Sequence, residues 1–243
     1  MASTSETGHA KNVANFHTLI EFVKGYGTAY NPSKQSIQMP ALLALKDSGD
    51  TEMANTLSKK NNYQNRVNER QLAFSDVENL ASRLVNALEA TDAATGSIKN
   101  AKSFRQKILG KRATQPIEST DPNAPDSKTI SVSQNSFDQI TEHLSGLKTV
   151  LEAEPNYTPN ETDLQVVTLS AKIQNLYATT TAVNTALAEL STSRISRNKI
   201  LYTEENSIYE TAKDVKKYIK SVFGVSSPEF NQIKGLKFTG LKK

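Results

Sequence analysis

From Asn160 to Phe223 the chain contains neither proline nor glycine, the residues that most often interrupt a helix. Within this stretch mostly apolar residues recur at alternating spacings of four and three: Leu169, Ile173, Leu176, Thr180, Val183, Leu187 and Leu190. That alternation is typical of a coiled-coil seam. We therefore predict a long helix with this seam buried, and a bend or break near 191–199. The seam's partner is either the other half of the same chain or a second chain.

The two halves of the chain align with each other in the same order along most of their length. Tyr30, Pro32 and Gln38 match Tyr157, Pro159 and Gln165, each pair 127 residues apart. Further matches pair 16–25 with 137–146, 66–80 with 194–208, and 102–110 with 216–224, so the first copy carries extra residues around 91–97. We interpret the chain as two tandem copies of one helical unit. The predicted segments are a first unit at 1–110, a Pro/Ser/Thr-rich linker at 111–135, a second unit at 136–224 and a tail at 225–243.

Helix starts can be predicted in both copies. The first helices are expected at 12–23 and 136–151, and Ser136 with Gln139 has the spacing of a capping box. Asn31-Pro32 and Thr158-Pro159 are expected to open the two long helices, because proline is well tolerated at the first helical position. Gly49 is expected to interrupt the first of these helices. The fold class predicted is all-α, an elongated helical bundle with long helices.

The composition supports a thin helical shape and narrows the chemistry. Only 37% of the residues are hydrophobic and no cysteine is present, so disulfides and thiolate metal sites are excluded. The longest apolar run, Ala41 to Leu45, is far shorter than a membrane-spanning helix. Residues 1–8 lack the charged and apolar regions of a secretory signal. We therefore expect a cytoplasmic location.

The tail begins with Ser227-Pro228-Glu229, a helix-start pattern, and its apolar residues can dock on the bundle. Phe223-Gly224, Ser227 to Phe230 and Gly235-Leu236-Lys237-Phe238 together resemble the ends of some uncharacterised bacterial helical proteins. The resemblance covers about sixteen residues of the chain. It implies a helical protein and carries no function.

No catalytic or metal-binding constellation stands out. His9, His17 and His143 form no His-x-x-x-His or Glu-x-x-His pair, which would place two ligands on one helix face. The neighbouring acids Glu152 with Glu154 and Glu204 with Glu205 are better explained as solvated helix faces. No phosphate-binding glycine loop is present. We predict that the protein is not an enzyme and has no cofactor.

Each copy ends with a basic helix, and this is the one recurring feature with a functional interpretation. The candidate polyanion-binding residues are Lys99, Lys102 and Arg105 in the first copy and Lys213, Lys216, Lys217 and Lys220 in the second. Such residues can bind nucleic acid or anionic lipid. They can equally solvate the outer face and complement the helix dipole, and we favour this second interpretation.

The leading functional hypothesis is a non-catalytic helical scaffold or protein-interaction protein that can self-associate. A membrane-active helical protein is the first alternative, and a polyanion or nucleic-acid binder is the second. The expected partner is a protein or a second copy of the chain. A membrane surface is a lesser candidate, and no small-molecule substrate is indicated.

Overall fold

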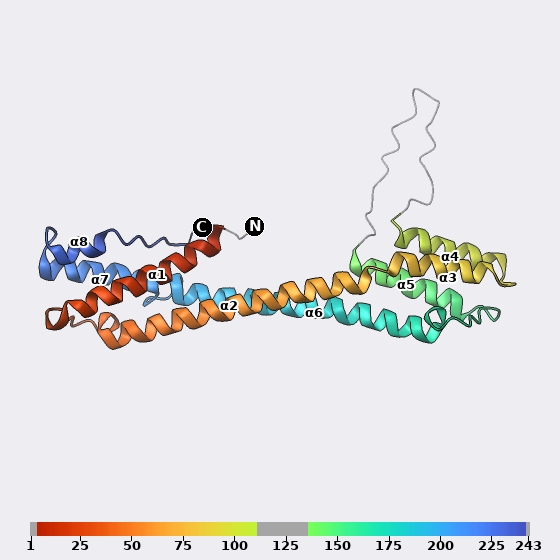
Figure 1. Cartoon of the computed structure of the whole chain (residues 1–243), viewed down its shortest axis with the longest axis horizontal. Helices are drawn as coiled ribbons and strands as arrows, with labels where there is room; N and C mark the ends of the chain where they lie inside the picture. Colours follow the sequence, from red (N-terminus) through yellow and green to blue (C-terminus); the bar gives the residue numbers. More distant parts are fainter. Residues whose placement is uncertain (1–3, 111–135, 242–243) are drawn as a thin grey trace, which may run out of the picture. The chain divides into compact units, whose positions relative to one another are not determined.

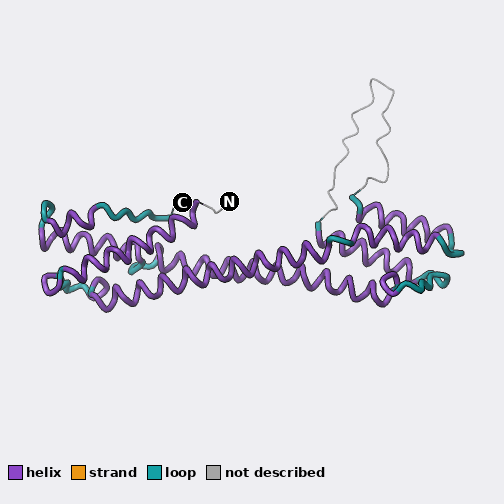
Figure 2. Tube along the Cα trace, viewed as in Figure 1, coloured by secondary structure: helices purple, strands orange, loops and turns teal. Residues whose placement is uncertain are grey.

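The computed structural model describes residues 4–110 and 136–241. The predicted linker at 111–135 lies outside the described residues. Within the described part the chain is helical and contains no strand (Figure 2), which confirms the all-α prediction. Two helices are much longer than the others, α2 at Met39–Phe74 and α6 at Val166–Asn198, as the sequence predicted.

The described chain divides into two compact units that do not follow the predicted segments. Compact unit 1 combines residues 1–63 with 186–243, and compact unit 2 contains residues 64–185. Each compact unit therefore contains part of both predicted copies. The long helices α2 and α6 each contribute one part to either unit.

In compact unit 1, the beginning of α2 and the end of α6 are joined by three further helices, α1 at Thr4–Gly25, α7 at Ile208–Phe223 and α8 at Pro228–Lys234. In Figure 1 the red α1 lies beside the blue α7 and α8. The buried residues of α1 repeat at spacings of three and four, which places them on one face. The core of this unit is formed mainly by these residues of α1 and α7: Phe16, Leu19, Ile20, Val23, Ile208, Ala212, Val215 and Ile219.

In compact unit 2, the other parts of α2 and α6 are joined by α3 at Val77–Glu89, α4 at Thr95–Ile108 and α5 at Phe137–Glu152. The α4 and α5 helices pack closely, because Gly146 of α5 leaves room for the Phe104 ring of α4. A Cβ at Gly146 would lie 2.4 Å from the nearest atom of that ring. The core of this unit includes Leu84, Leu88, Leu144, Leu147, Leu169 and Leu176.

The seam of α6 is buried as predicted except at one position. Leu169, Ile173, Leu176, Thr180, Val183 and Leu190 are buried, whereas Leu187 is 46% exposed and Ala186 is buried in its place. Two successive spacings of three, at 180–183–186, shift the phase of the seam, and Leu187 then falls outside it. The shift coincides with the boundary between the compact units at 185/186. The prediction for Leu187 was therefore wrong.

The prediction that the Tyr-x-Pro motifs open the long helices was wrong. Each motif leads into a short 3-10 turn, η2 at Gln35–Ile37 and η3 at Thr162–Leu164, and the long helix begins only afterwards. The Tyr30 hydroxyl donates a 2.6 Å hydrogen bond to the Ile37 carbonyl. The Tyr157 hydroxyl donates a 2.9 Å bond to the Leu164 carbonyl. The motifs therefore close a turn before the long helix by hydrogen bonding, and they do not cap the helix.

The glutamine that follows each turn also has the same role in both places. The side-chain amide of Gln38 donates to the Pro32 carbonyl at 3.1 Å, and that of Gln165 donates to the Pro159 carbonyl at 3.4 Å. Another short 3-10 turn, η1 at Gly27–Ala29, precedes the first of these motifs. The two matched sequences thus form the same set of local bonds.

Several smaller expectations are settled by the helix boundaries. Gly49 does not interrupt α2; it is buried inside it, where the side chain of Ile208 packs against the helix. The bend or break predicted near 191–199 lies later than expected: α6 is continuous to Asn198, and the α-helix ends in a π-helical turn, η4, at Lys199–Thr203. Ser136 caps α5 and Ser227 caps α8, each accepting a backbone N–H three residues on.

The basic last helices stop as expected, but their equivalence is less simple than the alignment suggested. Gly110 follows α4 with φ 65° and Gly224 follows α7 with φ 90°, left-handed values that favour glycine at a helix end. By the sequence matches, however, the beginning of α7 aligns with α3 and its end aligns with α4. The alignment therefore sets two helices, α3 and α4, against the single helix α7.

Candidate polyanion-binding helices

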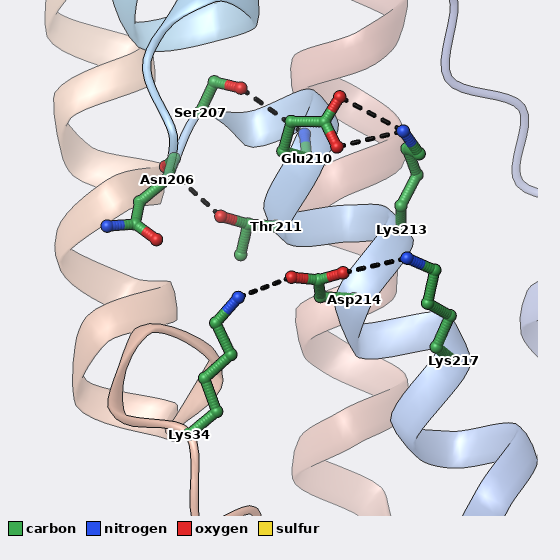
Figure 3. Close-up of polar contacts among 8 residues, drawn as sticks. All are labelled: Lys34, Asn206, Ser207, Glu210, Thr211, Lys213, Asp214 and Lys217. Carbon is green, nitrogen blue, oxygen red and sulfur yellow. Dashed lines mark hydrogen bonds and ion pairs between the residues drawn. The ribbon is translucent and has the colours of Figure 1, made fainter.

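The basic helix α7 is fixed in position by its apolar stripe and by its cap. Ser207 precedes the helix, and its Oγ accepts the backbone N–H of Glu210 at 3.4 Å. The stripe is buried in compact unit 1, so the lysines between its members lie on the outer part of the helix. Figure 3 shows that acidic side chains of the same helix lie among them.

Lys213 is held by a carboxylate one turn earlier. Its Nζ lies 2.9 and 3.1 Å from the two oxygens of Glu210 (Figure 3). The hydrogen bond to Glu210 raises the pKa of Lys213 above its ordinary value. Lys213 is therefore already paired with an anionic group.

Lys217 shares a carboxylate with a lysine from another part of compact unit 1. Asp214 accepts a 2.6 Å bond from Lys34, which precedes η2, and a 3.3 Å bond from Lys217 (Figure 3). The hydrogen bond from Lys34 is the main reason that the pKa of the Asp214 carboxyl lies below its usual value. Asp214 thus links α7 to the segment that precedes α2.

Lys216 points at the tail rather than at solvent. Its ammonium group donates to the Leu236 carbonyl and lies 3.5 Å from the Lys234 carbonyl. It also lies 5.5 Å from the centre of the Phe238 ring. Burial lowers the pKa of Lys216, because an ammonium group loses hydration there. Lys220, by contrast, is exposed and has no ion-pair partner among the described residues.

The candidate residues of the first copy lie on α4, in compact unit 2. Lys99 is exposed, and Lys102 forms an ion pair with Glu89 of α3. Arg105 is half-buried, and its Nε has no hydrogen-bond partner among the described residues. The seven candidates are therefore divided between two compact units, and within α7 most of them are engaged inside the chain.

Sequence reasoning missed a buried polar cluster in compact unit 1. His9 and Asn12 of α1 are both buried, and both meet the Tyr202 hydroxyl, His9 through Nδ1 at 2.6 Å and Asn12 through its amide at 3.3 Å. Tyr202 belongs to the π-helical turn η4, a conformation that often occurs at functional sites. Burial is the main reason that the pKa of Tyr202 is raised.

A signal for this cluster was present in the sequence. His9 and Asn12 continue the spacing of Phe16, Leu19 and Val23, so two polar residues occupy core-facing positions of α1. Buried polar groups require hydrogen-bond partners, so the placement of these two residues could have indicated a hydrogen-bond network. Arg197 of α6 is likewise buried, and it donates to the Asn198 side chain at 3.0 and 3.2 Å.

Compact unit 2 contains a cavity of about 230 Å³ beside α3 and the beginning of α6. Two ion pairs line it, Arg83 with Asp163 and Lys172 with Asp76, the second at 2.6 Å. Each charge in these pairs already faces an opposite charge. The cavity therefore offers no excess of either sign to a ligand.

No group of three or more potential metal-ligating side chains is found in residues 4–110 and 136–241. No helix in those ranges has a stretch long and apolar enough to cross a membrane.

Comparison of the chain with protein-family models, with curated proteins and with solved structures found no match in any of the three.

Proposed function

We propose that the protein is a non-catalytic helical interaction protein that self-associates through the exposed apolar residues beside the α2–α6 contact of compact unit 1. The observation that carries this proposal is the exposure of large apolar side chains on the two longest helices. Those in compact unit 1 are Leu57 at 58%, Leu187 at 46% and Ile195 at 58%. Large apolar side chains left exposed on the same pair of helices are candidates for an interaction surface.

Near these residues in sequence, the two helices make one well-defined contact. The hydroxyls of Thr56 and Ser193 are buried and lie 3.0 Å apart, and Lys59 pairs with Glu189 at 2.9 Å. Leu57 follows Thr56 directly, and Ile195 lies two residues beyond Ser193. The buried contact fixes the backbone from which the apolar side chains project, so a partner would meet a pre-organised surface.

The basic helices support the polyanion alternative less well, because Lys213, Lys216 and Lys217 are engaged by groups of the chain itself. An anionic ligand would have to compete with Glu210 and Asp214.

We also propose that the chain consists of two tandem copies of one unit. The equal bonds of Tyr30 and Tyr157, and of Gln38 and Gln165, support a common origin of the two segments. An interaction protein built from two copies can present related surfaces twice.

Sedimentation velocity over a range of concentrations tests self-association. We expect the average mass of the wild type to rise with concentration. The double variant Leu187→Ser with Ile195→Ser should have an association constant at least tenfold lower. Val167→Ser, at an apolar residue of compact unit 2 that is 71% exposed, is the matched control and should behave as the wild type. A wild-type chain that stays monomeric at every concentration would end the proposal.

A further inference from the structure

The tail crosses α1 and α7 as an extended segment. After α8, residues 236–241 show a period of two in burial: Leu236, Phe238 and Gly240 are partly buried, and the residues between them are exposed. Leu236 and Phe238 pack against the core of compact unit 1. This alternation is that of a β-strand lying on a surface, although its neighbours here are helices.

The helices hold this segment through its backbone. The side-chain amide of Asn12 donates to the Thr239 carbonyl at 2.8 Å and accepts the Thr239 N–H at 3.1 Å. The Asn15 amide donates to the Lys237 carbonyl at 2.7 Å, and Lys216 donates to the Leu236 carbonyl. These bonds use no side chain of the tail segment. The two asparagines and the lysine thus replace the neighbouring strand that a peptide would find at the edge of a sheet.

Selectivity comes from the side chains that face inward. Phe238 lies under the Lys216 ammonium group, an arrangement that favours an aromatic ring. Gly240 lies beside the Tyr209 ring, where an added methyl group would make an ordinary van der Waals contact at 3.5 Å. Lys216 lies in this groove with no carboxylate partner among the described residues. An ammonium group placed on backbone carbonyls and an aromatic ring suits a peptide ligand.

From this arrangement we propose that the groove formed by Asn12, Asn15 and Lys216 is a binding site for an extended peptide, and that it exchanges its own tail segment for the tail segment of a second copy. Three arguments favour this occupant. A second copy supplies the same apolar, aromatic and small residues in the same order. The segment is held by backbone hydrogen bonds and two partly buried side chains, so its local opening requires little free energy. Gly235 alone connects α8 to residues 236–241, and short connections favour exchange of an element between copies.

This inference goes beyond the proposed function and depends on none of the residues at the α2–α6 contact. The test uses the full-length chain and a fluorescent peptide with the sequence of residues 235–241. In one variant Leu236→Asp and Phe238→Asp displace the chain's own segment. We expect fluorescence anisotropy to show that this variant binds the peptide at least tenfold more tightly than the wild type, in which the groove is filled. Adding Asn12→Ala and Asn15→Ala to the variant should abolish the binding.

The controls separate the possible outcomes. A peptide of the same composition in scrambled order should not bind, and circular dichroism should show that every variant keeps its helical content. Failure of the folded, tail-displaced variant to bind the peptide would overturn the proposal. Equal binding by the wild type would overturn it as well, because the peptide would then lie elsewhere. Exchange of tails between copies would also raise the mass in sedimentation, but it would persist in the Leu187→Ser and Ile195→Ser variant, whereas association through the α2–α6 surface would be lost, so the two proposals can fail separately.

Discussion

The hydroxyl of Tyr157 donates a hydrogen bond to the carbonyl of Leu164, seven residues later, and closes the turn that precedes α6. Burial raises the pKa of Tyr157 to about 12. The phenolate has no proton with which to donate this bond. Its negative charge would also have to form in a buried position.

A pH dependence follows for Tyr157. Its folded pKa is raised above the ordinary value of 10, so its contribution to stability is fully present below pH 10 and is lost as the pH rises towards 12. Tyr157→Phe should cost about 1 kcal/mol at pH 7, the usual net value of a hydrogen bond, and the difference from wild type should shrink between pH 10 and 12. Thermal melts at several pH values measure this. Tyr177→Phe, at an exposed tyrosine, should change stability little at any pH.

Two leucines of α6 provide a matched pair. Leu176 is fully buried and Leu187 is 46% exposed. Leu176→Ala should cost about 2–5 kcal/mol, because it leaves a cavity, whereas Leu187→Ala should stay within about 0.5 kcal/mol of the wild type. Urea unfolding followed by circular dichroism gives both values. Equal losses would show that the two positions have the same environment.

Two helical glycines should respond in opposite directions to alanine. At Gly146 a Cβ would meet the Phe104 ring at 2.4 Å, whereas at Gly8 it would meet nothing within 4 Å. Gly146→Ala should destabilise the protein by about 1–3 kcal/mol through overpacking. Gly8→Ala should stabilise it by up to about 1 kcal/mol, because alanine favours a helix. Differential scanning calorimetry can rank both variants, and a stabilised Gly146→Ala would contradict the close α4–α5 packing.

Lys216 binds the tail through the Leu236 carbonyl, whereas Lys220 makes no such contact in the described part of the chain. Lys216→Ala should release the tail, and trypsin should then cleave after Lys237 at least about fivefold faster, as expected from the loss of about 1 kcal/mol. Lys220→Ala should leave the rate unchanged, because Lys220 is exposed and has no partner in the described part of the chain. Mass spectrometry of the early fragments measures both rates. Equal cleavage in the two variants would show that Lys216 does not retain the tail.

The sequence predicted the features that depend on local periodicity and missed those that depend on pairing between distant segments. Six of the seven seam residues of α6 are buried, because spacing alone determines the face of a helix. The prediction that Leu187 is buried was wrong, because the seam changes phase between Val183 and Ala186. The Tyr-x-Pro motifs were recognised, but not their role, since a proline is compatible both with a helix start and with a loop.

The candidate site shows the same division. The lysines of α7 were correctly expected on the same helix, but the carboxylate shared between Lys217 and Lys34 joins residues far apart in the chain. Asn12 and Thr239 are further apart still. Nothing in either local sequence specifies the other.

The composition of compact unit 1 has a consequence for how the chain acquires its structure. Residues 4–63 and 186–241 belong to one compact unit, so the whole of 64–185 must be synthesised before this unit can close. Bringing such distant segments together carries a loop entropy that grows with the length between them, and contacts of this kind slow folding. Residues 64–185 are continuous and face no such delay. On the ribosome, compact unit 2 should form first. The apolar face of α1 should stay exposed until α7 has been synthesised.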